Sequence, residues 1–126
     1  MSVGVLVVDD QAPFRRAVRA VLGAVPGFEL VAEATSGEEA VALAAALRPD
    51  LVLMDIKMAG MGGIEAARSI AETQPETMTI LVSTYREQDL PPHARTCGAE
   101  AYLRKSDFGG PVLRELWLSR ARRGRG

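Results

Sequence analysis

Four charged side chains from three separated parts of this chain could together perform metal-assisted chemistry on a carboxylate. Each lies at or near the end of a short apolar run, and they are Asp9, Asp10, Asp55 and Lys105. Carboxylates that are crowded together repel one another and resist ionisation, so such a cluster needs a compensating cation. Mg²⁺, a hard divalent ion that prefers oxygen ligands, would supply that charge. The residue types therefore predict Mg²⁺-assisted chemistry at this cluster.

The apolar runs that lead to these residues are typical of buried strands, because they are short and rich in Val and Leu. They are Val3–Val8, Leu51–Met54 and Ala101–Leu103. In an open parallel sheet, ligands bind just beyond the carboxyl ends of the strands. The three runs would therefore carry three carboxylates and one ammonium into a single crevice.

Strands and helices are expected to alternate along the whole chain, which has no internal repeat. Two further strands are expected at Phe28–Ala34 and Met78–Ser83, and helices at about residues 13–25, 37–47, 64–73 and 111–122. Ser36 and Glu39 form a capping box at the start of the second helix. Right-handed crossovers between the strands give an α/β fold, a doubly wound five-stranded parallel sheet with helices on both faces.

A further helix is expected between the strands at Met78–Ser83 and Ala101–Leu103, and its pattern is the weakest of the alternation. It should lie in residues 86–97, but Pro91 and Pro92 interrupt that segment. Proline cannot donate a hydrogen bond in a helix interior and disfavours helix in the residue before it. We expect a shortened helix over about residues 92–97, preceded by a loop over 86–90. His93, the only histidine, is expected on its surface.

Length and composition indicate one domain with an ordinary hydrophobic core. The chain has 126 residues, of which 48% are hydrophobic and 25% charged. No apolar stretch approaches the roughly 20 residues of a membrane span. Cys97 is the only cysteine, which excludes an internal disulfide and suits a buried apolar position. We therefore expect a cytoplasmic protein without membrane contact.

Charge is unevenly distributed between the body of the chain and its end. Residues 114–126 hold five arginines and one glutamate, a net +4, whereas residues 1–113 carry a net −5. Because the acidic body is a poor nucleic-acid surface, the basic end is interpreted as a solvated helix end or linker. The expected organisation is a globular domain over residues 1–118 and a basic helix end or linker over 119–126.

The segments VLVVDD, LVLMDIKMAGMGGIEA, ILVST and GAEAYLRK, in this order, resemble the receiver domain of two-component response regulators. The resemblance covers essentially the whole chain and implies the flavodoxin-like receiver fold with strand order 2-1-3-4-5. Ser106 stands after Lys105 where many receivers have proline, which resembles the NarL/LuxR-type branch. A non-proline bond there is expected to be trans.

The resemblance also implies roles for the charged residues. Asp55 would be the phosphoacceptor, and Lys105 would pair first with its carboxylate and then with a phosphoryl oxygen. Asp10 would ligate Mg²⁺ directly and Asp9 mainly through water. Lys57 would contribute its backbone carbonyl to the metal.

Two further residues would connect the site to its output. Ser83 matches the hydroxyl residue that bonds the phosphoryl group, although the adjacent Thr84 is an alternative. Tyr102 matches the aromatic residue that rotates as the serine loop moves, and packing in the core is its alternative role.

The function implied is a phosphorylation switch rather than a metabolic enzyme. Its partner would be a sensor histidine kinase or a phosphotransfer protein, and a homodimer is a possible signalling form. DNA would be bound only through an output domain that this chain does not contain.

Two alternatives remain from other classes. Ala59 and Gly62 loosen a loop beside the metal site, which leaves open a protein-binding module that works without phosphorylation. A hydrolase of the haloacid-dehalogenase kind would need its second aspartate two residues after the first. Asp9 and Asp10 are adjacent, which argues against that class.

Overall fold

The computed structural model describes residues 2–125, with side chains to residue 120. Five strands and four α-helices follow one another in the expected alternation. They are β1 (Val3–Val8), α1 (Ala12–Ala24), β2 (Phe28–Ala34), α2 (Gly37–Leu47), β3 (Leu51–Asp55), α3 (Gly63–Thr73), β4 (Met78–Ser83), β5 (Ala101–Arg104) and α4 (Gly110–Arg125). None of these helices combines the length and the apolar character that a bilayer span requires.

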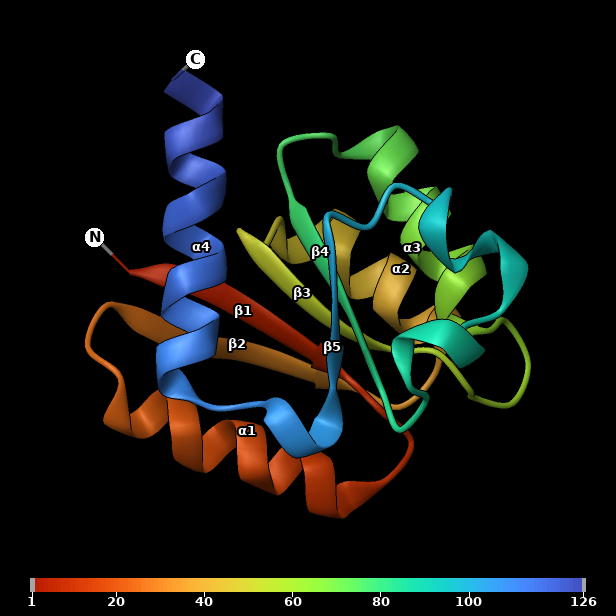
Figure 1. The fold of residues 1–126 in the computed structure, drawn as a ribbon, viewed down its shortest axis with the longest axis horizontal. Coiled ribbons are helices and arrows are strands. Elements are labelled where there is room, and N and C mark those ends of the chain that lie inside the picture. The colour runs from red at the N-terminus through yellow and green to blue at the C-terminus, as the bar shows by residue number, and fades with distance from the viewer. Residues whose placement is uncertain (1, 126) are drawn as a thin grey trace.

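The strands form one parallel sheet in the order β2-β1-β3-β4-β5 (Figure 1). This order confirms the predicted α/β doubly wound architecture. All five residues of β3 are buried, as are all six of β4, because both strands are covered on both faces. Because β1, β3 and β4 pair in parallel, their carboxyl ends lie side by side at one end of the sheet.

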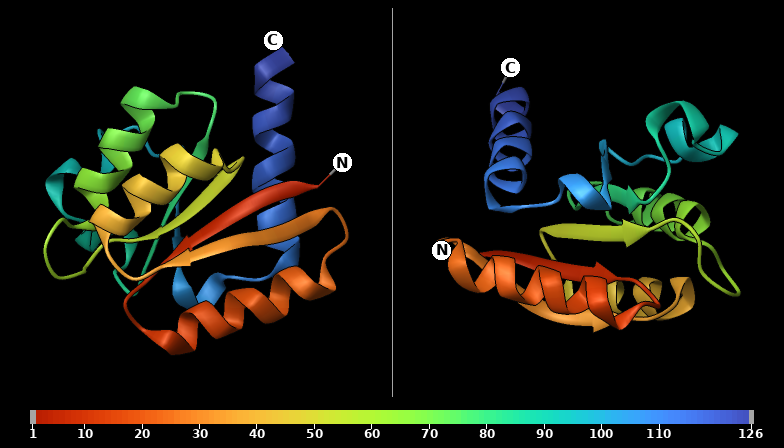
Figure 2. Two further views of the ribbon diagram at one scale, coloured as in Figure 1. Left: turned by 180° about the vertical axis from the view of Figure 1, so that it is seen from behind. Right: turned by 60° about the horizontal axis from the view of Figure 1, so that its bottom comes forward.

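Helices cover both faces of the sheet (Figure 2), and one apolar core lies on each face. One core holds small residues of α2 and α3, among them Ala44 and Ala67, which let these helices pack close to the strands. The other holds Val18 and Leu22 of α1 together with Leu113 of α4. Strand side chains alternate between the two cores, so the sheet is rigidly fixed between its helices.

The serine half of the predicted capping box is present at the start of α2, whereas Glu39 bonds the residue before the N-cap rather than Ser36 itself. Ser36 Oγ accepts a hydrogen bond of 3.1 Å from the Glu39 backbone N–H. Glu39 in turn accepts a hydrogen bond of 2.7 Å from the backbone N–H of Thr35. Local sequence alone therefore fixes where this helix begins.

The connection between β4 and β5 contains only short 3₁₀ segments, Glu87–Asp89 and Pro92–Arg95. The expected shortening is confirmed, and Pro92 lies in the first turn of the second segment. Two details of the prediction were wrong, because residues 87–89 are not a simple loop and the second segment ends before Cys97. Pro91 adopts an extended backbone that separates the two segments.

The helix after β5 is longer than the sequence pattern predicts. α4 begins at Gly110 and continues to Arg125, projecting past the end of the sheet (Figure 1). Arg120 attaches it to the body through Glu100 at 2.9 Å and the Glu76 carbonyl at 2.8 Å. The boundary expected at residue 118 falls inside this helix and stays a prediction. Residue 126 and the side chains of residues 121–125 lie outside the described part of the chain.

Gly63 provides a test of how tightly α3 packs against the end of β3. A Cβ on Gly63 would lie 1.7 Å from the Asp55 carbonyl oxygen, so Gly63→Ala is expected to lower the free energy of unfolding by about 1–3 kcal/mol. Gly23→Ala in α1 is the matched control, because its Cβ would meet nothing within 4 Å. That change should raise stability by about 0.5–1 kcal/mol. Urea unfolding of both variants checks the prediction, and equal effects would contradict it.

Candidate functional site

Three carboxylates converge at the edge of the sheet where β1 and β3 end. Carboxylate oxygens of Asp9, Asp10 and Asp55 all lie within 4.8 Å of one another. Asp55 is the last residue of β3, and the two other aspartates follow β1 directly. The parallel pairing of β1 with β3 places Val8 beside Met54, so the residues after them come together. The fold thus brings the predicted aspartates into one cluster.

Asp9 is the most deeply buried of the three and is fixed on both sides. It is fully buried, its Oδ1 accepts a hydrogen bond of 2.8 Å from the Gln11 N–H, and its Oδ2 lies 2.6 Å from Lys105 Nζ. Apart from this ion pair, Oδ2 has no hydrogen-bond donor in the described residues. One buried anionic oxygen therefore depends on a cation for its compensation.

Asp55 carries the strongest electrostatic perturbation in the cluster. Burial and the negative charge of Asp9 raise the pKa of Asp55 from 3.8 to about 6, although the nearby Lys105 acts in the opposite direction. The carboxylate is 7% exposed, so it remains reachable from the outer edge of the sheet. At neutral pH it is ionised and poorly solvated, which suits a nucleophile or a metal ligand.

Lys105 supplies the positive charge that the carboxylates require. Its ammonium lies 3.5 Å from Asp55 Oδ1 in addition to its shorter contact with Asp9. Burial lowers the pKa of Lys105, but the hydrogen bond to Asp9 and the charge of Asp55 outweigh it and raise the pKa overall. The ammonium also lies 5.2 Å from the ring centre of Phe14, a cation–π distance. The lysine is therefore charged and held close to both aspartates.

A hydrogen-bonded link joins the end of β4 to β5. The Ser83 hydroxyl is buried and accepts a hydrogen bond of 3.1 Å from the Tyr85 N–H. The Tyr102 hydroxyl donates to the Tyr85 carbonyl. Burial raises the pKa of Tyr102, while its hydrogen bond with Ser83 acts to lower it. The main chain of Tyr85 therefore contacts both Ser83 and Tyr102, the two residues for which the sequence predicts a switching role.

These groups surround a cavity of about 340 Å³ that is open to solvent. Its walls contain an acidic side, a basic side and three residues that carry a hydroxyl group. The lining residues are Asp10, Gln11, Asp55, Lys57, Ser83, Thr84, Tyr85 and Lys105. Both Ser83 and Thr84 line the cavity, but only Ser83 is buried, and Lys57 is exposed. The volume suits a small anion with a bound cation rather than a large ligand.

The donor set fits a hard divalent cation. Three carboxylates from β1 and β3 offer oxygen ligands within one coordination sphere, and Asp9 Oδ2 lacks a second donor. Oxygen ligands of this kind suit Mg²⁺, Mn²⁺ or Ca²⁺ better than softer metals. The acidic cluster is therefore able to bind a metal ion.

Three neighbours of the cluster escaped the sequence analysis as site residues. Phe14 lies beside Lys105, Gln11 donates to Asp9, and Arg15 donates to the Asp9 carbonyl at 2.9 Å. Their proximity to the aspartates in sequence was the signal that could have found them, since all three follow Asp10 within five residues.

Other residues lie as the sequence suggested. Cys97 is buried, with its thiol 3.5 Å from the Ala94 carbonyl, and His93 is exposed. The peptide bond between Lys105 and Ser106 is trans.

The raised pKa of Asp55 predicts a pH-dependent effect on stability. The ionised carboxylate opposes folding, so its penalty is complete above about pH 6 and absent below about pH 4. In EDTA, Asp55→Asn is expected to raise the free energy of unfolding by up to roughly 3 kcal/mol at pH 7, and by little at pH 4. Urea unfolding at both pH values measures this, with the exposed Asp107→Asn as control. A gain that does not depend on pH would contradict the assignment.

Comparison with known proteins identifies the family. Residues 5–114 match the response regulator receiver domain. The chain is 39% identical over 101 residues to the response regulator GacA of Pseudomonas aeruginosa, which covers 80% of this chain and 47% of GacA. It is 34% identical over 104 residues to the transcriptional regulatory protein DegU of Brevibacillus brevis, covering 82% and 44%. The chain thus spans about half the length of the curated relatives it matches.

Solved structures agree with this assignment. The signal receiver domain of the response regulator NarL from Mycobacterium tuberculosis superposes with a TM-score of 0.84 at 30% identity, covering 96% of this chain and 97% of that one. A CheX–CheY complex with BeF₃ and Mg²⁺ from Borrelia burgdorferi matches with a TM-score of 0.78 at 28% identity, covering 90% and 85%. The chain therefore belongs to the response regulator receiver domains, which are signalling switches rather than enzymes that turn over a separate substrate.

Proposed function

We propose that this domain is a Mg²⁺-dependent switch that is phosphorylated on Asp55 by a sensor histidine kinase or a phosphotransfer protein in the cytoplasm. The observation that carries the proposal is the position of Asp55, buried, ionised at neutral pH and beside a lysine in an open cavity. The family membership and the acidic cluster support the same conclusion.

The reaction is a transfer of one phosphoryl group to a carboxylate. A carboxylate oxygen of Asp55 forms a bond to phosphorus while the phosphorus–nitrogen bond of the donor phosphohistidine breaks. The bonding electron pair stays on the imidazole nitrogen, and the product is an acyl phosphate. A bound Mg²⁺ would neutralise charge on the phosphoryl oxygens. It would be held by Asp10, Asp55 and the Lys57 carbonyl, and by Asp9 mainly through water.

Two side chains of this chain would act on the transferred group. The Lys105 ammonium would move from the aspartates to a phosphoryl oxygen, since the new group carries more negative charge than the carboxylate it replaces. The Ser83 hydroxyl would donate to another phosphoryl oxygen and give up its bond from the Tyr85 N–H. Because Tyr85 also contacts Tyr102, that exchange would release the tyrosine side chain to rotate.

The output is proposed from the relatives, which are about twice as long as this chain and include the transcriptional regulatory protein DegU. Residues 1–118 would form the receiver, and residues 119–126 a basic helix end or linker toward a DNA-binding domain. A homodimer would be one form in which the phosphorylated state signals. DNA contact would belong to the output domain rather than to this chain.

A phosphorylation-independent protein-binding module is the second candidate. The observation that favours it is the replacement of a helix between β4 and β5 by 3₁₀ segments, together with the residues Ala59 and Gly62 in the loop beside the metal site. These departures leave the aspartate cluster intact, so we rank this function second.

Phosphorylation of Asp55 is tested by intact-mass measurement after incubation with Mg²⁺ and acetyl phosphate. The wild type is expected to gain the mass of one phosphoryl group. Asp55→Asn should gain none, because the amide is not a nucleophile, and EDTA should prevent the gain in the wild type. Stoichiometric phosphorylation of folded Asp55→Asn would refute the assignment of the acceptor. A folded wild type that also takes no phosphoryl group from a histidine kinase would favour the binding module.

Lys105→Ala tests the coupling of phosphorylation to output. Without the ammonium, the acyl phosphate loses its cationic partner directly after β5, so its formation should no longer alter self-association. Light scattering with and without phosphodonor measures this change in wild type and variant. Arg104→Ala is the neighbouring control, since Arg104 is the exposed last residue of β5, directly before Lys105. Full coupling in Lys105→Ala would exclude the proposed role of the lysine.

A further inference from the structure

Asp10 is the weakest-held member of the aspartate cluster, although it is expected to contact the metal directly. It is exposed, and in the described residues its carboxylate accepts one long hydrogen bond of 3.4 Å, from the Gln11 side chain. Asp9, by contrast, is buried and ion-paired. The direction in which Asp10 presents its carboxylate therefore depends on the main chain that leads into it.

Two hydrogen bonds hold the main chain of Asp9, one at its N–H and one at its carbonyl, which belongs to the peptide that leads to Asp10. The Asp9 N–H donates to the Ala34 carbonyl at the end of β2, at 3.0 Å. The Asp9 carbonyl accepts a hydrogen bond of 2.9 Å from Arg15 Nη1. Because the peptide unit is planar, the direction of this carbonyl fixes the position of the Asp10 Cα.

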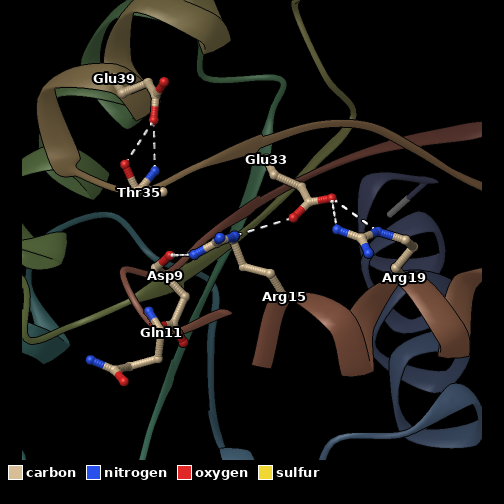
Figure 3. A network of polar contacts seen from close by, with 7 residues as sticks. All are labelled: Asp9, Gln11, Arg15, Arg19, Glu33, Thr35 and Glu39. Atoms are coloured by element: carbon tan, nitrogen blue, oxygen red, sulfur yellow. Dashed lines mark hydrogen bonds and ion pairs between the residues drawn. The ribbon is translucent and has the colours of Figure 1, made fainter. Parts of the chain in front are cut away.

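The guanidinium of Arg15 is itself fixed by β2 (Figure 3). Arg15 Nε donates to Glu33 Oε1 at 3.2 Å, while Arg19 binds the other carboxylate oxygen of Glu33 at 2.6 Å. The Arg15 and Glu33 side chains are only 20% and 24% exposed. A planar guanidinium can hold a carboxylate and a carbonyl at once with fixed geometry. Arg15 thus connects the loop that bears Asp10 to the neighbouring strand.

We propose that Arg15 is a positioning residue for the cation site, orienting the Asp9–Asp10 peptide so that the Asp10 carboxylate faces the metal. The inference rests on the proposed function, in which Asp10 is a metal ligand. Arg15 acts through the main chain and touches neither metal nor phosphoryl group. Glu33 offsets part of the charge of Arg15, although it also pairs with Arg19.

The test is Mg²⁺ affinity, because electrostatics and positioning predict opposite signs for Arg15→Gln. Removing a positive charge near the cluster would by itself tighten Mg²⁺ binding. Loss of positioning is expected to weaken it by about tenfold, as for other groups that orient metal ligands. Arg19→Gln is the matched control, since Arg19 binds the same Glu33 but not Asp9. Its Mg²⁺ affinity should stay within about twofold of wild type, as expected for an exposed ion pair.

Affinities are measured by NMR titration of the full chain with MgCl₂, with melting curves as a check on folding. The rate of phosphorylation by acetyl phosphate is then followed against Mg²⁺ concentration. Arg15→Gln should need more Mg²⁺ for half-maximal rate and reach nearly the wild-type maximum, a split that general destabilisation would not produce. Arg15→Lys keeps the charge but not the two-pronged contact, and serves if the glutamine variant does not fold. It too should bind Mg²⁺ more weakly.

The outcomes separate this inference from the proposed function. Unchanged or tighter Mg²⁺ binding in Arg15→Gln, or in Arg15→Lys if only that variant folds, would overturn the positioning role while leaving the switch intact. Equal weakening in Arg15→Gln and Arg19→Gln would also overturn it, because the effect would then come from Glu33. A wild type that binds no Mg²⁺ would overturn both.

Discussion

Mutual repulsion among three carboxylates is the constraint on which the rest of the site depends. Asp9 and Asp55 are buried at the ends of adjacent strands, where their charges are poorly solvated. Lys105 follows β5, the strand at one edge of the sheet, and its ammonium contacts both aspartates. The ammonium also lies beside the ring of Phe14. The 3₁₀ turn at Lys105–Asp107 places the lysine at this point, directly after β5. The cavity is thus bordered by carboxylates and by the Lys105 ammonium, which offsets part of their charge.

The same arrangement links stability to function. An Asp55 carboxylate with a raised pKa opposes folding at neutral pH, and the two apolar cores on either side of the sheet must offset it. A cation or a phosphoryl group changes the charge balance at a place where burial makes such changes costly. A small chemical event at Asp55 can therefore shift the preferred position of the surrounding loops.

The segment between β4 and β5 is where this domain differs most from a regular alternation of strands and helices. Two 3₁₀ turns occupy it, and the first begins at Glu87, two residues after Tyr85, whose main chain contacts both Ser83 and Tyr102. A short cavity of about 210 Å³ lies between these turns and β5. The hydrogen bonds of Tyr85 with Ser83 and Tyr102 therefore lie beside a segment with few helical hydrogen bonds. Such a segment can rearrange more easily than an α-helix.

The sequence alone determined the alternation of elements, the N-cap at Ser36 and the identity of the charged residues, because these depend on local patterns and on residue types. It also located the interruption at Pro91 and Pro92, since proline acts through its own backbone. The distances within the cluster were decided by the tertiary structure, because they depend on where the parallel sheet places the ends of β1, β3 and β5. Arg15 and Phe14 acquire their contacts only when α1 packs against the sheet. The length of α4 also exceeded the local pattern, and Arg120 gains its partners in the folded body alone.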